Sequence, residues 1–153
     1  RGLGDVYKRQ DLKDALEIRM ALEELAAGLA CKRIDDDGRK KLRDACERFR
    51  KAVIKKNLNE IVDADVAFHN VIYEVTDNKR LVNMFQNLRE QVYRYRVEYL
   101  KDASYHIKLA EEHEALTDAI LRGDADLAEE VTRKHIYDQE KIVIANAVKS
   151  SDA

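Results

Sequence analysis

No proline occurs among the 153 residues of this chain, and only five residues are glycine. Proline breaks or kinks helices and glycine weakens them, so their scarcity permits long uninterrupted helices. Folds built from strands and tight turns usually need these residues in their turns. The hydrophobic content of 45% is sufficient for one core in a chain of this length. The sequence therefore predicts a single all-α domain.

Apolar residues recur at helical spacing from Asp11 onward. Short polar connections separate the periodic segments, which favours an antiparallel bundle of about six helices. Residues 1–10 contain two glycines and no helical period, so we expect a non-native or disordered leader there, with the domain over 11–148 and a tail over 149–153. The predicted helices are 11–33, 37–56, 58–75, 79–101, 105–122 and 124–148.

Charge and hydropathy exclude two classes of partner. Lysine and arginine total 28 against 30 aspartates and glutamates, so no net field attracts a polyanion such as nucleic acid. The basic segment 39–56 is interrupted by Asp44 and Glu47 and is typical of a solvated helix face. No apolar run approaches the ~20 residues that span a bilayer. We therefore predict a cytoplasmic domain without a membrane partner, whose Cys31 and Cys46 are reduced thiols.

Three histidines and one aspartate occur at spacings that allow them to meet. Asp65 and His69 are four residues apart and so share one face of a helix. His113 precedes Gly123 by ten residues, and His135 follows it by twelve. In a helical hairpin that turns at Gly123, these two histidines lie roughly 15 and 18 Å from the turn and are nearly level. The spacing therefore predicts that all four side chains face one point.

One carboxylate and three imidazoles form a ligand set typical of a divalent metal, with Zn²⁺ favoured and Ni²⁺ or Mn²⁺ as alternatives. Such a set leaves coordination positions open, and an anionic oxygen of a small carboxylate can occupy them. A single helical histidine is more often a satisfied core or surface residue. His106 lies ~10 Å along the helix axis from His113, so we expect it to be structural.

Several short motifs are shared with one known family. They are Glu17-Ile18-Arg19 with Leu22-Glu23, Asp65-Val66-Ala67-Phe68-His69, Asn78, and His113 with Ala119-Ile120, Gly123-Asp124, Ala128 and His135. Over residues 11–148 the chain resembles the FCD family, the FadR C-terminal effector domain of GntR-type transcription regulators. The resemblance implies a metal bound at Asp65, His69, His113 and His135, the same residues that the spacing indicates.

The resemblance also implies a homodimer that senses a small carboxylate and is not an enzyme. It implies that DNA is bound only through an N-terminal winged-helix domain, which this chain lacks. Arg19 in the first motif is the candidate for effector contact, although a helix salt bridge with Glu23 is the alternative. Tyr93, Arg94 and Arg96 could complete a pocket for an organic anion, or the tyrosine could be a core or dimer contact.

Two other functions remain open at this point. A metal-dependent hydrolase or lyase could use the same cation to activate water, but no motif supplies an accompanying base, a phosphate loop or a nucleophile elbow. A metal-free helical interaction module would contain the same histidines as ordinary core residues. Metal content and turnover separate these alternatives from a sensor.

Overall fold

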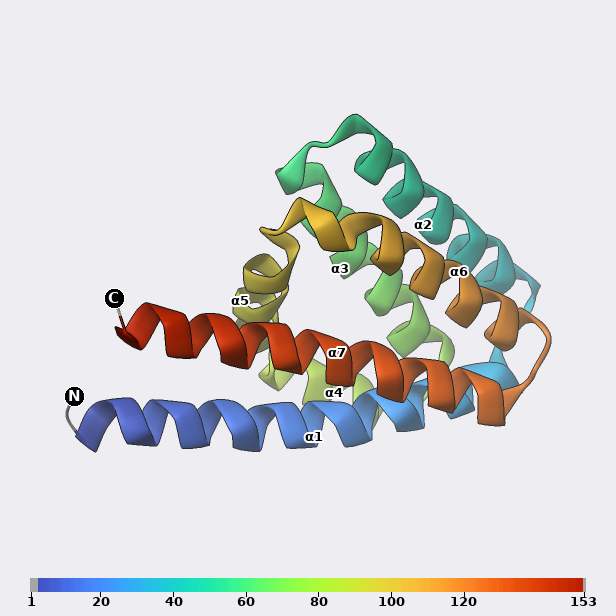
Figure 1. The fold of residues 1–153 in the computed structure, drawn as a ribbon. Helices are drawn as coiled ribbons and strands as arrows, with labels where there is room; N and C mark the ends of the chain where they lie inside the picture. Colours follow the sequence, from blue (N-terminus) through green and yellow to red (C-terminus); the bar gives the residue numbers. More distant parts are fainter. Residues whose placement is uncertain (1–2, 153) are drawn as a thin grey trace.

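The computed structural model describes residues 3–152, which contain seven α-helices, one short 3₁₀ helix and no strand. The prediction of an all-α bundle is confirmed (Figure 1). Within the described range, no helix combines the length and apolar character required to cross a membrane. The helices are α1 (Leu3–Arg33), α2 (Asp36–Lys55), α3 (Leu58–Val75), α4 (Lys79–Asn87), α5 (Arg89–Leu100), η1 (Ala103–Tyr105), α6 (His106–Leu121) and α7 (Ala125–Asp152).

The two longest helices, α1 and α7, run antiparallel along one side of the molecule, so the chain ends at the edge where it begins (Figure 1). On the other side, α2 packs against α3 and α6. The α6–α7 hairpin turns at Gly123, whose φ of 71° is a conformation that glycine adopts without strain. This hairpin brings His113 and His135 to one level, as the spacing predicted.

Side chains of the preceding residues cap the starts of several helices. The side chain of Asp35 accepts a hydrogen bond from the backbone N–H of Gly38 at the start of α2. Asn78 caps α4 in the same way, and the Asp124 carboxylate accepts from the N–H of Leu127 in the first turn of α7. These side chains satisfy backbone donors that have no partner inside their helices.

The helices at both ends extend beyond the predicted bounds of 11–33 and 124–148. Helix α1 begins at Leu3 and α7 runs to Asp152, so the described parts of the expected leader and tail are helical. That the leader is non-native stays a prediction. Arg1, Gly2 and Ala153 lie outside the described residues. Helices α1 and α7 pack side by side, and this pairing favours long helices (Figure 1).

The expected single helix over 79–101 is also wrong, because the chain bends at Leu88 between α4 and α5. Phe85 of α4 packs in one hydrophobic cluster, whereas Tyr99 and Leu100 of α5 pack in another. A straight helix could not present both faces to two separate clusters. The backbone N–H of Leu88 bonds to the carbonyl of Phe85, a tighter turn that allows the change of direction.

The hydrophobic core is divided into these two clusters. The first includes Phe68 and Leu116, with further residues from α1, α2, α4 and α7. The second includes Phe49, Tyr99 and Leu109, with further residues from α3 and α7. Nearly all of these side chains are withdrawn from solvent.

A layer of buried polar side chains separates the clusters. Along α6, Leu109 belongs to the second cluster and Leu116 to the first, and His113 lies between them. Along α3 and α7 as well, buried polar residues lie between residues of the second cluster and residues of the first. The layer contains Arg19, Glu23, Asp65, His69, Arg96, His113, Thr132, His135 and Gln139. Most of the residues predicted to form the site therefore lie in this buried polar layer.

Candidate metal centre

His69, His113 and His135 converge from α3, α6 and α7. Each offers one ring nitrogen such that the three atoms lie within 4.8 Å of one another. All three side chains are 2% exposed or less. Three nitrogens at this separation, shielded from bulk water, could contact a single ion whose bonds to nitrogen are ~2.1 Å long.

Asp65, one turn before His69 on α3, completes the cluster. Its Oδ1 is 3.0 Å from Nε2 of His113 and 3.5 Å from Nε2 of His69. Neighbouring ligand atoms around one divalent ion are separated by roughly 3.0–3.4 Å when bonds are ~2.1 Å long. The structure thus brings together all four residues that the sequence predicted, with the carboxylate on the side of His69 and His113.

The other oxygen of Asp65 is held by α5. Its Oδ2 accepts hydrogen bonds from Nε of Arg96 at 2.5 Å and from the hydroxyl of Tyr99 at 2.8 Å. Burial alone would raise the pKa of Asp65, but the interactions with His69, the Arg96 guanidinium and His113 outweigh it and hold the pKa well below its usual value. Asp65 is therefore an anion at neutral pH, oriented with Oδ1 toward the histidines.

The histidine nitrogens test whether this cluster suits a metal. None of the four ring nitrogens of His69 and His113 makes a well-aligned hydrogen bond among the described residues, although all four atoms are buried. Nε2 of each ring faces Oδ1 of Asp65, whose lone pairs a metal would share with these nitrogens. Burial lowers the pKa of His113 to about 4, and burial also lowers that of His69, so both rings are neutral at pH 7. Buried, neutral nitrogens without well-formed hydrogen bonds are costly unless something binds them, and the residues present fit a divalent cation.

His135 differs because both of its nitrogens have partners. Nδ1 is 2.5 Å from Oε2 of Glu112, and Nε2 is 2.9 Å from Nε2 of Gln139. A carboxylate that accepts from one nitrogen of a metal-binding histidine fixes the ring orientation and leaves the other nitrogen's lone pair available. Glu112 is in this position.

The profile of one family, the FCD domain, matches residues 14–138, which is most of the chain. The chain belongs to the FCD domain family. This confirms the resemblance on which the sequence interpretation relied.

Curated relatives of this FCD domain are transcription regulators. HTH-type transcriptional regulator LutR of Bacillus subtilis (strain 168) is 26% identical over 143 residues, covering 90% of this chain and 64% of that protein. A protein of Escherichia coli (strain K12) named for regulation of an L-lactate dehydrogenase operon is 29% identical over 128 residues, covering 80% of this chain and 48% of that protein. The chain thus spans about half to two thirds of these relatives.

A solved structure has the same fold. E. coli McbR/YncC superimposes on this FCD domain with a TM-score of 0.74 and 19% sequence identity, over 86% of this chain and 69% of that chain. At this identity the match establishes the arrangement of the helices. A shared fold does not imply a shared function, which depends on the residues of the site.

Arg19, the first candidate for effector contact, lies inside the polar layer. It is 1% exposed, and its Nε is 3.6 Å from Oε1 of Glu23. The predicted alternative, a helix ion pair with Glu23, is therefore present. It is buried, and at 3.6 Å it does not satisfy the hydrogen-bond donors of the guanidinium. Nε and Nη2 of Arg19 have no hydrogen-bond partner among the described residues. Glu23 also accepts a hydrogen bond from Tyr73 and lies 3.9 Å from Nδ1 of His69.

The other three effector candidates lie around a different cavity. Tyr93 and Arg94 are exposed and line a cavity of about 660 Å³ between α3, α4 and α5. Arg96 lines the same cavity and also binds Asp65, so it touches both regions. Arg19 does not line this cavity. The structure therefore separates the four residues that the sequence grouped into one pocket.

His106 lies outside the cluster. Its Nε2 donates to the carbonyl of Leu100 at 2.7 Å, a contact that ties the start of α6 to the end of α5. This agrees with the structural role expected for it. Cys31 and Cys46 are free thiols among the described residues.

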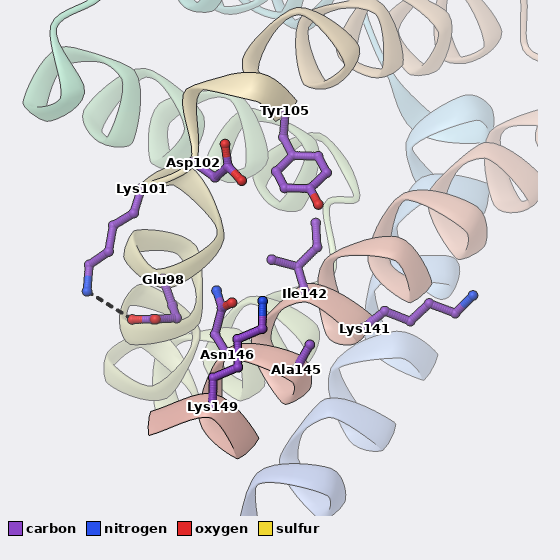
Figure 2. A pocket seen from close by; sticks show the side chains of 9 residues that line it. All are labelled: Glu98, Lys101, Asp102, Tyr105, Lys141, Ile142, Ala145, Asn146 and Lys149. Atoms are coloured by element: carbon purple, nitrogen blue, oxygen red, sulfur yellow. Dashed lines mark hydrogen bonds and ion pairs between the residues drawn. The ribbon is translucent and has the colours of Figure 1, made fainter. Parts of the chain in front are cut away.

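A surface groove beside the centre contains none of the predicted ligands. Its volume is about 370 Å³, and it lies between α5, η1 and the second half of α7 (Figure 2). Tyr105 and Ile142 form its inner wall and also line a cavity of about 10 Å³ that reaches His135. These two side chains are therefore shared by the groove and the small cavity beside His135.

Sequence reasoning missed four contributors to the centre. Glu112 and Gln139 contact His135, while Tyr73 and Tyr99 bind the buried carboxylates. A signal for Gln139 was present, because it follows His135 by four residues and so shares its helix face. The contact of Glu112 with α7 depends on how α6 and α7 pack and has no local signal.

Proposed function

We propose that this FCD domain is the effector-sensing part of a GntR-type transcription regulator, with a divalent cation bound by Asp65, His69, His113 and His135. The observation that carries the proposal is the convergence of three buried histidines on one carboxylate, with the nitrogens of His69 and His113 lacking well-aligned hydrogen bonds. Zn²⁺ is the first candidate because three imidazoles and one carboxylate are borderline ligands, and Ni²⁺ or Mn²⁺ are alternatives. When bound, the cation would attract a carboxylate oxygen to an open coordination position.

The proposed effector is a small organic carboxylate. Arg19 supports this, because its buried guanidinium has donors without partners and a fork geometry that matches a carboxylate. Arg19 is linked to His69 through Glu23, which places it at the edge of the histidine cluster. Arg96 binds Asp65, and Tyr93 and Arg94 line the outer cavity. We therefore assign these three residues either to the route by which the ligand enters or to contacts with the part of the ligand farthest from the metal.

We further propose that the protein acts as a homodimer and contacts DNA through an N-terminal winged-helix domain. The relatives support the contact with DNA, because their names describe transcription regulators and they are longer than this chain. Ligand binding in the polar layer would change how α1, α3, α6 and α7 pack, since all four contribute side chains to it. The N-terminal winged-helix domain would respond to that change with an altered affinity for DNA.

The first test is metal content and acid binding. Elemental analysis should find about one divalent cation per wild-type chain and none in the His69→Ala/His135→Ala double variant. Thermal denaturation should then show that a small acid raises the Tm of the metal-loaded wild type but not of the double variant. L-Lactate belongs in the panel because one relative is named for an L-lactate dehydrogenase operon. Absence of metal after reconstitution would contradict the proposal.

Glu112 provides a second check on the metal. The Glu112→Gln variant keeps the side-chain size but weakens the acceptor for Nδ1 of His135, which is now 2.5 Å away. Loss of such a partner typically costs 10–100-fold in metal affinity, so we expect a decrease of about tenfold or more in Zn²⁺ affinity, measured by competition with a chelating dye. The control is Glu111→Gln, the exposed neighbour on α6, which should bind Zn²⁺ as the wild type does. Equal affinities for both variants would remove Glu112 from the centre.

A further inference from the structure

Gln139 is a buried residue in contact with the proposed centre, and it belongs to none of the sequence motifs described above. It is 2% exposed and lies on α7, one turn after His135. Its Nε2 is 2.9 Å from Nε2 of His135. The amide of Gln139 therefore occupies the nitrogen of His135 that faces away from Glu112.

The protonation of His135 follows from its two partners. The Glu112 carboxylate accepts only, so Nδ1 of His135 must carry the hydrogen of that contact. In the neutral ring, Nε2 then carries the lone pair and accepts an N–H from Gln139. A metal ion would need this same lone pair, because Nδ1 is already engaged.

The rest of the Gln139 side chain is weakly held. Its Oε1 is buried and has no hydrogen-bond partner among the described residues. Gln139 also lines the cavity of about 10 Å³ beside His135, together with Tyr99 and Glu112. That volume is about the space of one water molecule, so the Gln139 amide borders a small void rather than tight packing on this side.

We infer that Gln139 is an internal competitor of the metal, which caps the lone pair of His135 in the metal-free protein and is displaced when the cation binds. This inference rests on the metal centre proposed above and adds a regulatory element to it. The amide lowers metal affinity, because its hydrogen bond to His135 must break before Nε2 can coordinate. It also makes the position of one α7 side chain depend on metal occupancy.

The Gln139→Leu variant tests the competition. It removes the hydrogen bond from the metal-free state alone, so Zn²⁺ affinity should rise by about twofold to tenfold, the range that corresponds to one buried hydrogen bond. A residue that merely supported the fold would give the opposite sign, since its loss would disorder the centre and weaken binding. The matched control is Asn146→Leu. Asn146 is an amide residue on the same helix and lines the surface groove between α5, η1 and α7 (Figure 2). Its Zn²⁺ affinity should equal that of the wild type.

A second measurement needs no variant. In the wild type, the side-chain NH₂ signals of Gln139 should shift on addition of Zn²⁺, and the Nε2 signal of His135 should change from a hydrogen-bonded to a metal-bound value. Unchanged Gln139 signals in protein that has bound Zn²⁺, or weaker Zn²⁺ binding by Gln139→Leu in a folded protein, would overturn this inference and leave the metal centre standing. Wild-type protein that binds no Zn²⁺ would overturn both.

Discussion

Replacing Asp65 by alanine is expected to lower the free energy of unfolding of the metal-free protein by about 3–5 kcal/mol. Asp65 accepts hydrogen bonds from Arg96 and Tyr99, and all three side chains are buried. An arginine guanidinium is too basic to lose its proton at neutral pH, so Arg96 remains charged when its partner is removed. An unpaired charge in a low-dielectric interior accounts for the large loss.

Urea denaturation in the presence of a chelator measures this effect, because metal loss then contributes nothing. The double variant Asp65→Ala/Arg96→Met is the control, since removing both charges leaves no buried ion. It should recover most of the stability lost in the single variant. A loss below about 1 kcal/mol for Asp65→Ala would show that Arg96 finds another partner or reaches solvent.

Replacing His113 by leucine should have opposite effects on stability and on metal binding. Nδ1 of His113 is buried without a partner, and Nε2 makes no well-aligned hydrogen bond although it lies 3.0 Å from Oδ1 of Asp65. A buried polar group that is satisfied so poorly costs about 1–3 kcal/mol. The ring packs against Phe68 and Phe49, with centroid distances of 4.2 Å to each, so leucine enters an apolar environment. We expect the metal-free variant to be more stable than the wild type by about 1–3 kcal/mol. Its Zn²⁺ affinity should fall by more than about a hundredfold, since a direct ligand contributes more than a residue that only orients one.

His106→Leu is the matched control for His113→Leu. Both histidines are buried on α6, but His106 has a satisfied hydrogen bond to the carbonyl of Leu100. His106→Leu should therefore lose stability and keep its Zn²⁺ affinity. Urea denaturation and calorimetric titration measure the two quantities separately. If His113→Leu destabilises the metal-free protein, the poorly satisfied nitrogens do not carry the cost assigned to them.

These two predictions separate two contributions of the polar layer to stability. Asp65 stabilises the metal-free fold through its hydrogen bonds with Arg96 and Tyr99. Removal of the His113 imidazole is expected to stabilise the metal-free fold, so the burial of this side chain is explained by binding rather than by folding. His113 is then a position where function and stability conflict.

The histidine cluster shows how much of the site local spacing could predict. Asp65 and His69 had to share a face because they are one turn apart on α3. His113 and His135 had to be level because Gly123 lies almost midway between them. The effector candidates show the limit of this reasoning. Arg19 lies in the buried polar layer, Tyr93 and Arg94 line the outer cavity, and Arg96 contacts both. Residue type suggested one pocket, and packing placed them in two regions.

Helical periodicity, the absence of proline and the capping residues determined the all-α fold and most helix positions, because these depend on interactions within a few residues. Tertiary packing decided the bend at Leu88, where two clusters require different faces of one segment. It also decided the partners of the centre. Arg96, Glu112 and Gln139 reach Asp65 or His135 through the arrangement of whole helices, and buried side-chain contacts between distant segments leave no periodic trace in the chain.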